Sequence, residues 1–491
     1  MGNIEALNTG RAGSRHSAWN LEVKDPQRSA LIDNQLDCTG IRPVPLEERT
    51  DTQYSKIFFI WFSANFNILS FSAGTLGPAI FELSFRDAAL TILFFNVLCC
   101  AFPAYLTTWG PKLGLRQMIA SRYSFGYYGV IVPCVLNLIG MFGFCILNAI
   151  LGGQTLASVA RHDLSWSVGI VIISLISLVV SFFGYEVLNW YERLAWIPVF
   201  IAFLVALGVS AKHLSIPESA GNIPTSAPAI LSFASTIAGF VIAWSALSSD
   251  FTAYYHPAVS SWKIFLYSYL GLLVPIITLQ CLGAAVVVAV PFVPTWETEY
   301  AGGNIGGLLH AILQPTHGFG DFLTVLLALS VAGNIAATFY SISFNLQVLI
   351  PPLVNVPRYL FSIVATAIVV PLAIVGSHSF YDTLVDFLGL LGYWSGAYVA
   401  ILLVEHLMFR KNDFSLYSTD DWSTPIRLPY GFAALSAGVA SFGVVVPCMN
   451  QVWYTGPIAE KTGDIGFEVA ITASALLYIP FRWVELRWRG I

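Results

Sequence analysis

The sequence predicts an all-α integral membrane protein with twelve transmembrane helices, because of its composition and its recurring apolar stretches. Hydrophobic residues make up 56% of the 491 residues and charged residues 10%, whereas soluble domains carry roughly 25% charged residues. The mean hydropathy is +0.71. The lipid bilayer is therefore the expected surrounding of most of the chain.

Twelve stretches are long enough to span a bilayer, which requires roughly 20 mainly apolar residues. They lie near residues 57–80, 87–107, 128–156, 167–184, 194–211, 229–251, 263–292, 322–350, 358–376, 383–407, 430–450 and 466–483. With the N-terminus inside, twelve of the 23 Lys and Arg residues fall in inner loops and the C-terminal tail, and four fall in outer loops. Since positive loops stay cytoplasmic, we expect a multi-pass protein of the cell membrane with both termini in the cytosol.

Residues 1–56 precede the first span and are polar, with mixed charge and no apolar core behind a basic start. This pattern lacks the features of a cleaved signal peptide, and we expect a disordered cytosolic tail. The net charge is −5 and the positive residues are scattered over loops. The sequence therefore predicts no nucleic-acid partner.

Several kinds of chemistry find no support in the sequence. The seven cysteines lie mostly within spans and lack metal-ligand spacing, so we interpret them as small apolar residues and expect no metal site. No Gly-rich phosphate loop followed by Lys and Ser or Thr occurs. We therefore expect neither an enzyme nor an ATP-driven pump, and no cofactor.

The first span contains a run that is typical of an interrupted helix. The residues expected to break it are Ser70, Gly74, Gly77 and Pro78. Backbone groups freed inside hydrocarbon are tolerated mainly where they line a cavity. The sixth span has a second weak point at Gly239, residues 243–245 and residues 248–249. Two broken spans in corresponding positions of two halves indicate the central site of a transporter.

The third span places an aromatic ring and an amide on one helix face, because Phe144 and Asn148 are four residues apart. A flat heteroaromatic solute could stack on the ring and bond the amide through its polar edge. The alternative is that Phe144 packs against lipid or a neighbouring helix and that Asn148 bonds a facing helix. Spacing alone leaves both interpretations open.

Trp244 lies near the middle of the sixth span, whereas most membrane tryptophans lie at the interfaces. A stacking role and an ordinary packing role are both open for it. Asp250, near the cytoplasmic end of the same span, is interpreted as a solvated or helix-end carboxylate.

The eighth span carries too many polar residues for a lipid-facing helix, so we expect it to face the bundle interior. A cation could bind between residues 70–73 of the broken first span and Thr338 or Ser341. A proton-coupled transporter would instead need an intramembrane carboxylate. The candidates lie near span ends, and none stands out among Asp321, Asp382 and Asp386.

Several segments together have a family-specific pattern. They are PVPLEERT at 43–50, NILSFSAGTLGP at 67–78, NAILGGQ at 148–154, residues 244–254, LGYW at 391–394, and the pairs at 405–406 and 409–410. Through them the chain after its tail resembles the fungal purine-cytosine permease branch of the nucleobase:cation symporter-1 family. The resemblance implies a leucine-transporter-like fold, in which ten spans form two inverted five-helix repeats and two extra helices follow.

The resemblance also implies a domain arrangement and an activity. The expected parts are the tail at 1–56, a transport core at 57–407, a cytoplasmic loop at 408–429, and the last two spans with a short tail at 430–491. The implied activity is secondary active transport at the plasma membrane. A symporter of this kind imports purines and cytosine with a cation, the proton in fungal members, by alternating access.

By position, the resemblance places substrate-binding residues on five side chains. Phe144 and Trp244 would stack on the solute, and the others would hydrogen-bond its polar edge. The full set is Ser72, Phe144, Asn148, Trp244 and Asn334.

Two positions depart from the family pattern. The family usually has Trp at the position of Phe144, and Asn-Asn-x-Pro-Asn where this chain reads Gly-Asn-Ile-Ala-Ala at residues 333–337. A site built to bond a polar edge loses discrimination of about 10⁴-fold or more when a partner is missing, so we expect a changed substrate. The alternatives are a permease for a vitamin such as pyridoxine or for a specialised metabolite, and, in another class, a non-transporting sensor on the same fold.

Overall fold

The computed structural model describes residues 40–160, 163–182, 184–214 and 226–490, and for residues 184–193 it describes only the helix. The long helices of this part are α2 (Tyr54–Asn65), α3 (Ile68–Ala79), α4 (Phe85–Cys99), α9 (Ile131–Val159), α10 (Trp166–Phe182), α11 (Gly184–Ser210), α12 (Ala227–Ile242), α13 (Ser261–Ala289), α16 (Gly318–Leu349), α17 (Arg358–Gly376), α18 (Phe380–Val404), α19 (Phe432–Val445) and α21 (Gly466–Arg489).

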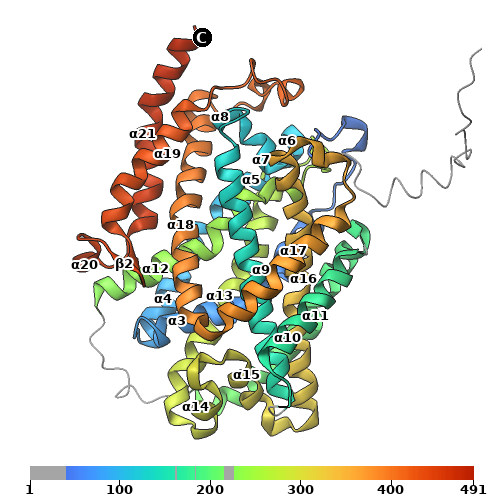
Figure 1. Cartoon of the computed structure of the whole chain (residues 1–491), viewed down its shortest axis with the longest axis vertical. Coiled ribbons are helices and arrows are strands. Elements are labelled where there is room, and N and C mark those ends of the chain that lie inside the picture. The colour runs from blue at the N-terminus through green and yellow to red at the C-terminus, as the bar shows by residue number, and fades with distance from the viewer. Residues whose placement is uncertain (1–39, 161–162, 183, 215–225, 491) are drawn as a thin grey trace, which may run out of the picture. The chain divides into compact units, whose positions relative to one another are not determined.

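Short elements connect these helices. They are α5 (Ala101–Thr107), α6 (Trp109–Leu113), α7 (Gln117–Ala120), α8 (Arg122–Phe125), α14 (Pro294–Tyr300), α15 (Ile305–Leu313), α20 (Ala459–Thr462), and the antiparallel pair β1 (Asn450–Gln451) and β2 (Tyr454–Thr455). Figure 1 shows α6, α7 and α8 at the same end of the bundle as the C-terminus, and α14 and α15 at the opposite end. The loop after the second span and the C-terminus therefore share one side, as expected.

Within the described residues, eight helices are long and apolar enough to cross a membrane, and the bent pair α2 and α3 makes up to nine. The helix α10 and the stretch Phe432–Cys448 are shorter, and one stretch, Arg358–Phe409, contains both α17 and α18. The helical membrane fold is thus confirmed. The number of twelve spans stays a prediction.

The first span is broken, but not at the residues predicted. The helices α2 and α3 meet at a bend of 55°, between Asn65 and Ile68. Asn67 is extended, and its side chain accepts hydrogen bonds from the backbone N–H groups of Leu69 and Ser70. An Asn in this position is a strong N-cap, so the helix restarts there.

The four residues expected to break the span lie inside α3 instead, and the prediction of their role was wrong. Ser70 is in its first turn, and Pro78 is one residue from its end at Ala79. At Gly74 a Cβ atom would lie 1.9 Å from the carbonyl oxygen of Gln280 on α13. The glycines therefore permit close helix packing rather than a break.

The sixth span does change conformation where expected. The helix α12 ends at Ile242, and two 3₁₀ turns follow, at Ala243–Ala246 and Ser248–Phe251. The predicted weak point at residues 243–249 is confirmed. Gly239 lies inside α12, where a Cβ atom would lie 1.9 Å from the carbonyl oxygen of Leu388 on α18, so it too serves close packing.

Residues 40–53 form an ordered segment against the end of the bundle that carries α6. Val44 N donates to the carbonyl of Gly114 over 2.9 Å, and Asp51 forms a parallel bridge with Tyr255. The backbone of the loop after the sixth span thus finds partners in this segment. The expected disordered tail at 1–56 is corrected for residues 40–56, while residues 1–39 lie outside the described residues.

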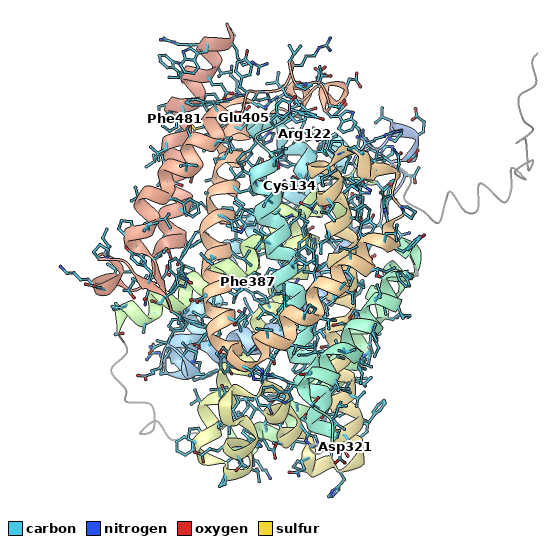
Figure 2. The ribbon with its side chains drawn as sticks, viewed as in Figure 1. Arg122, Cys134, Asp321, Phe387, Glu405 and Phe481 are labelled. Atoms are coloured by element: carbon cyan, nitrogen blue, oxygen red, sulfur yellow. The ribbon has the colours of Figure 1, made fainter. Side chains whose placement is uncertain are left out.

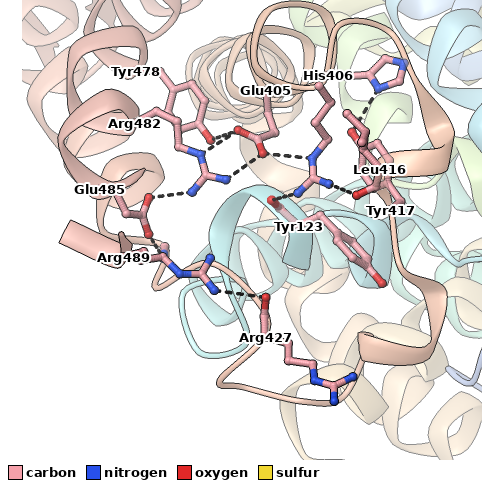
Figure 3. A network of polar contacts seen from close by, with 12 residues as sticks. Tyr123, Glu405, His406, Leu416, Tyr417, Arg427, Tyr478, Arg482, Glu485 and Arg489 are labelled. Atoms are coloured by element: carbon pink, nitrogen blue, oxygen red, sulfur yellow. Dashed lines mark hydrogen bonds and ion pairs between the residues drawn. The ribbon is translucent and has the colours of Figure 1, made fainter. Parts of the chain in front are cut away.

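A buried charged network joins α18 to α21 (Figure 3). The Glu405 carboxylate accepts hydrogen bonds from Tyr478 at 2.9 Å, from Arg482 at 2.9 and 2.8 Å, and from Arg410 at 3.1 Å. Arg482 also donates to Glu485 at 3.0 Å. Buried charges persist where they are paired and hydrogen-bonded, so this network fixes the last span to the end of α18.

Candidate functional site

Two amide side chains meet where the first span is broken. On α9, Asn148 Nδ2 donates to Asn334 Oδ1 on α16 over 2.9 Å. Asn334 Nδ2 donates in turn to the carbonyl of Ala64 over 2.7 Å. Both amides are buried. They link the third and eighth spans to the break in the first span.

A third amide extends this arrangement to the sixth span. Asn65, beside Ala64 in the chain, accepts a hydrogen bond from Trp244 Nε1 over 3.1 Å. We name Asn65, Asn148 and Asn334 the amide wall. It connects the breaks of the first and sixth spans through side chains, as expected of a transporter's central site.

Two aromatic rings lie beside the amide wall. The centroids of Phe144 and Trp244 are 6.4 Å apart and their planes differ by 15°. We name the space that they line the aromatic slot; its volume is about 20 Å³, and Thr338 and Trp394 also line it. Carbon atoms in contact lie about 3.5–4.0 Å apart, so a flat ring between two others needs about 7 Å. The two rings must part slightly to admit a solute.

Neighbouring rings hold this pair in place. Phe387 on α18 contacts Phe144 edge to face at 5.2 Å, and Trp61 contacts Trp244 in the same way at 5.4 Å. Figure 2 shows Phe387 between the two ends of the bundle. Edge-to-face pairs restrict ring orientation, so the slot has a defined shape before any solute enters.

Two buried polar atoms of the predicted set have no hydrogen-bond partner among the described residues. They are Oδ1 of Asn148 and Oγ of Ser72, and both residues are fully buried. Leaving a buried polar group unpaired costs about 1–3 kcal/mol. Each atom is therefore a place where a ligand can hydrogen-bond.

The structure brings four of the five predicted site residues together. Phe144 and Trp244 stack, Asn148 bonds Asn334, and Asn148 Nδ2 also donates to the carbonyl of Phe144 over 2.9 Å. Ser72 lies on α3, and no described contact joins it to the other four. Asn65 was missed by sequence reasoning, although two asparagines around Phe66 in an apolar stretch were a visible signal.

The hydroxyls considered for a cation are mostly engaged with backbone carbonyls. Ser70 donates to the carbonyl of Asn65 over 2.6 Å, and Thr338 to that of Asn334 over 2.7 Å. Ser341 Oγ is buried and has no hydrogen-bond partner among the described residues. In the same part of the chain, no group of three or more His, Cys, Asp or Glu side chains could hold a metal ion.

Asp250 differs from its interpretation as a solvated carboxylate. Its side chain is 3% exposed, and Oδ1 accepts a hydrogen bond from the backbone N–H of Gln117 over 2.7 Å. The turn after the sixth span is thus fixed to the start of α7. The sequence could not show this contact, because 133 residues separate the two partners.

At the opposite end of the bundle, three hydroxyls join α14, α18 and α3. The Tyr381 hydroxyl hydrogen-bonds that of Tyr300 at 2.5 Å and that of Thr75 at 3.1 Å. Thr75 also donates to the carbonyl of Ser72 over 2.7 Å. Burial raises the pKa of Tyr300 to about 12. We name this contact the tyrosine latch.

A bundle of apolar helices with two breaks beside a buried amide and aromatic cluster defines the protein as a membrane transporter. A family model described as "Permease for cytosine/purines, uracil, thiamine, allantoin" matches residues 43–469. The chain belongs to this family, and is a permease rather than an enzyme.

Curated relatives agree with this assignment. The chain is 38% identical over 463 residues to the purine-cytosine permease fcyB of Emericella nidulans, with 93% of this chain and 90% of that protein covered. It is 36% identical to the purine-cytosine permease FCY21 of Saccharomyces cerevisiae, with 92% and 87% covered. It is also 29% identical to the vitamin B6 transporter TPN1 of the same yeast, with 94% and 90% covered.

Among solved structures, the chain is similar to Mhp1, a nucleobase-cation-symport-1 family transporter, in a closed conformation with bromovinylhydantoin bound. The TM-score is 0.72 at 18% identity, and 91% of this chain and 95% of that chain are covered. The inward-facing conformation of Mhp1 gives a TM-score of 0.69. The leucine-transporter-like helical fold expected from the family resemblance is thereby confirmed, while the number of twelve spans stays a prediction.

Proposed function

We propose that the protein imports purine bases and cytosine, or a closely related heteroaromatic solute, together with a proton. The observation that carries the proposal is the aromatic slot beside the unpartnered Oδ1 of Asn148. Aromatic rings stack on the faces of a flat solute, while an amide oxygen accepts from an N–H group on its edge. The purine-cytosine permeases among the relatives support the same solute class.

In this proposal, transport proceeds by alternating access. Solute enters between Phe144 and Trp244, and the hydrogen bond from Trp244 to Asn65 joins the two broken spans. Movement at either break therefore shifts a ring that contacts the solute. One group of helices rocks against the other and opens the site inward. Asn334 and Ser72 supply further hydrogen bonds to the polar edge once the slot has opened.

The proposed location is the plasma membrane with both termini in the cytosol. The excess of Lys and Arg in the loops assigned to the inside supports this orientation. The placement of α6 to α8 and the C-terminus at one end of the bundle is consistent with it (Figure 1).

A second candidate is the import of a vitamin such as pyridoxine. The likeness to the vitamin B6 transporter TPN1 favours it, as do Gly333, Ala336 and Ala337 in place of the amides and proline usual in the purine-cytosine permeases. Pyridoxine is also a flat heteroaromatic ring, so the aromatic slot would serve both solutes. The family match favours either solute over the alternative of a sensor without transport.

The test is uptake of radiolabelled adenine, hypoxanthine, cytosine and pyridoxine at two pH values, in cells that lack their own permeases for these solutes. Saturable uptake of the bases that rises at acid pH supports the first proposal. Uptake of pyridoxine alone supports the second. Uptake that does not change with pH would exclude proton coupling for either solute.

The site itself is tested by Asn148→Ala. We expect KM to rise about 5- to 100-fold, because removing a buried hydrogen-bond partner of the solute costs about 1–3 kcal/mol. The matched control on the same helix is Thr155→Ala, because the Thr155 hydroxyl donates only to the carbonyl of Leu151, at 2.7 Å. Unchanged uptake of every accepted solute by Asn148→Ala would show that the pocket is assigned wrongly.

A further inference from the structure

A second and larger cavity lies beside Asn334. Its volume is about 210 Å³, against about 20 Å³ for the aromatic slot. Residues of α2, α11 and α16 line it, and the two cavities share no lining residue. The hydrogen bond between Asn148 and Asn334 links the helix that lines the slot to the helix that lines this cavity. Asn334 therefore connects the lining of this cavity to the helix that carries Phe144.

Of these two cavities, the larger one has room for an aromatic ring in this conformation. A cavity of about 150 Å³ is known to hold benzene, and one of about 10–15 Å³ holds a single water molecule. By this measure the slot accommodates about one water, whereas the cavity beside Asn334 accommodates a ring and its substituents. A solute that has left the slot would find space there.

The lining of the larger cavity offers the same chemistry as the slot. Trp196 on α11 and Phe66 at the break contribute aromatic surface, and Ser63 and Ser330 contribute hydroxyl groups. The Ser330 hydroxyl accepts a hydrogen bond from Ile68 N over 3.3 Å, so that it lies directly beside the start of α3. A flat solute with a polar edge is the class of ligand that suits this combination.

Asn334 is the amide that lines the larger cavity. An amide has two N–H donors and an oxygen with two lone pairs. The described hydrogen bonds of its side chain are one accepted from Asn148 and one donated to Ala64, which leaves one donor and one lone pair. The neighbouring Gly333 also lines the cavity. Because Gly333 has no side chain, the cavity keeps the space that a longer side chain at this position would occupy.

We propose that the cavity lined by α2, α11 and α16 is a second binding station for the same flat heteroaromatic solute, separate from the aromatic slot, so that the protein can hold one molecule at each. Asn334 lines this station and bonds Asn148 on the helix that carries Phe144 of the slot. This inference rests on the proposed function, because it takes the solute class from the slot.

The experiment is equilibrium binding of radiolabelled adenine, and separately of pyridoxine, to the purified full-length protein in lipid nanodiscs. We expect two molecules of the accepted solute per chain. Ala195→Leu fills the cavity from α11 and should reduce the number to one, and Ser63→Leu should do the same from α2. The control Ile201→Leu lies on the lipid-facing side of α11, where Ile201 is 46% exposed, and should retain two.

The outcomes separate the two proposals. If the protein binds one molecule per chain, and both cavity-filling variants still bind one, the second station is overturned and the proposed function stands. Binding of neither solute overturns both proposals. Thermal melting of each variant shows whether it is folded, and the two fillers lie on different helices, so that misfolding of one leaves the other as the test.

Discussion

At the scale of single residues, Asn65 holds the Trp244 ring, which lines the aromatic slot. Its Oδ1 accepts from Trp244 Nε1 over 3.1 Å, and its Nδ2 donates to the carbonyl of Trp61 over 2.9 Å. Trp61 in turn contacts the Trp244 ring edge to face. Under the proposed function, Asn65 is thus a positioning residue, which would act on the solute through the indole.

We expect Asn65→Ala to raise the KM for uptake about 5- to 100-fold with little change in the amount of protein at the cell surface. The indole N–H would be left without its partner, which costs about 1–3 kcal/mol, and each 1.4 kcal/mol is a factor of ten. The measurement is uptake kinetics normalised to surface protein. The control is Asn65→Ala in a Trp244→Phe protein, which has no indole N–H, and there it should raise KM hardly at all. An equal increase in KM with Trp or Phe at position 244 would exclude the positioning role.

The residues of the site could be predicted where a local pattern exists. Phe144 and Asn148 share a helix face by their spacing, and the structure places both at the centre of the bundle. Asn65 lies 179 residues from Trp244 in the chain, so no periodicity could join them. The carbonyl of Ala64 could not be predicted as a hydrogen-bond partner either, because every residue type has the same backbone carbonyl.

At the scale of helices, Gly74 and Gly239 mark the closest crossings. A Cβ atom at either position would lie 1.9 Å from a backbone oxygen, that of Gln280 on α13 or of Leu388 on α18. A backbone oxygen cannot avoid the added atom by a change of rotamer, as a side chain can. Sequence reasoning interpreted Gly74 as a helix breaker because Gly has this effect in isolated helices, whereas in membrane bundles it also permits close approach.

Gly74→Ala should therefore reduce delivery of the protein to the membrane rather than uptake by delivered protein. The added methyl group would force α3 and α13 apart. The measurement is surface amount and melting temperature, compared with Gly208→Ala on α11, where nothing lies within 4 Å of the added Cβ atom. Normal delivery together with lost uptake would favour a conformational role for Gly74 instead.

The tyrosine latch is a second feature at this scale, since it joins α14, α18 and α3 by neutral hydrogen bonds. We expect Tyr381→Phe to loosen this contact. The measurement is the rate at which an impermeant thiol reagent labels a cysteine that replaces Leu391, a residue that lines the slot. This rate should increase severalfold. The background needs the native cysteines replaced. Tyr359→Phe, at an exposed tyrosine on α17, is the control; equal labelling rates would show that the latch does not limit access.

At the scale of the whole described molecule, the two ends of α18 are held by different forces. One end carries the charged network around Glu405, and the other carries the tyrosine latch. Figure 2 shows Glu405 at one end of the bundle and Phe387 well away from it. The family resemblance predicted the fold of this assembly, but not that residues 40–56 pack against it, because a polar and charged segment has no apolar period to predict its contacts.

Glu405→Ala tests how much the charged network contributes to stability. The change removes the buried carboxylate that Arg482 and Arg410 share, although Arg482 keeps its ion pair with Glu485. Breaking a buried ion pair costs about 3–5 kcal/mol, so we expect a clearly lower melting temperature and less protein at the surface. The KM of the protein that remains should be unchanged, because the network lies away from the slot.

The double variant Glu405→Ala with Arg482→Leu should lose less stability than the sum of the two single effects, since the partners are coupled. Asp421→Ala, which breaks the solvent-exposed pair with Arg427, should leave the melting temperature as it is. A normal melting temperature for Glu405→Ala with an altered KM would instead assign the network to the transport cycle.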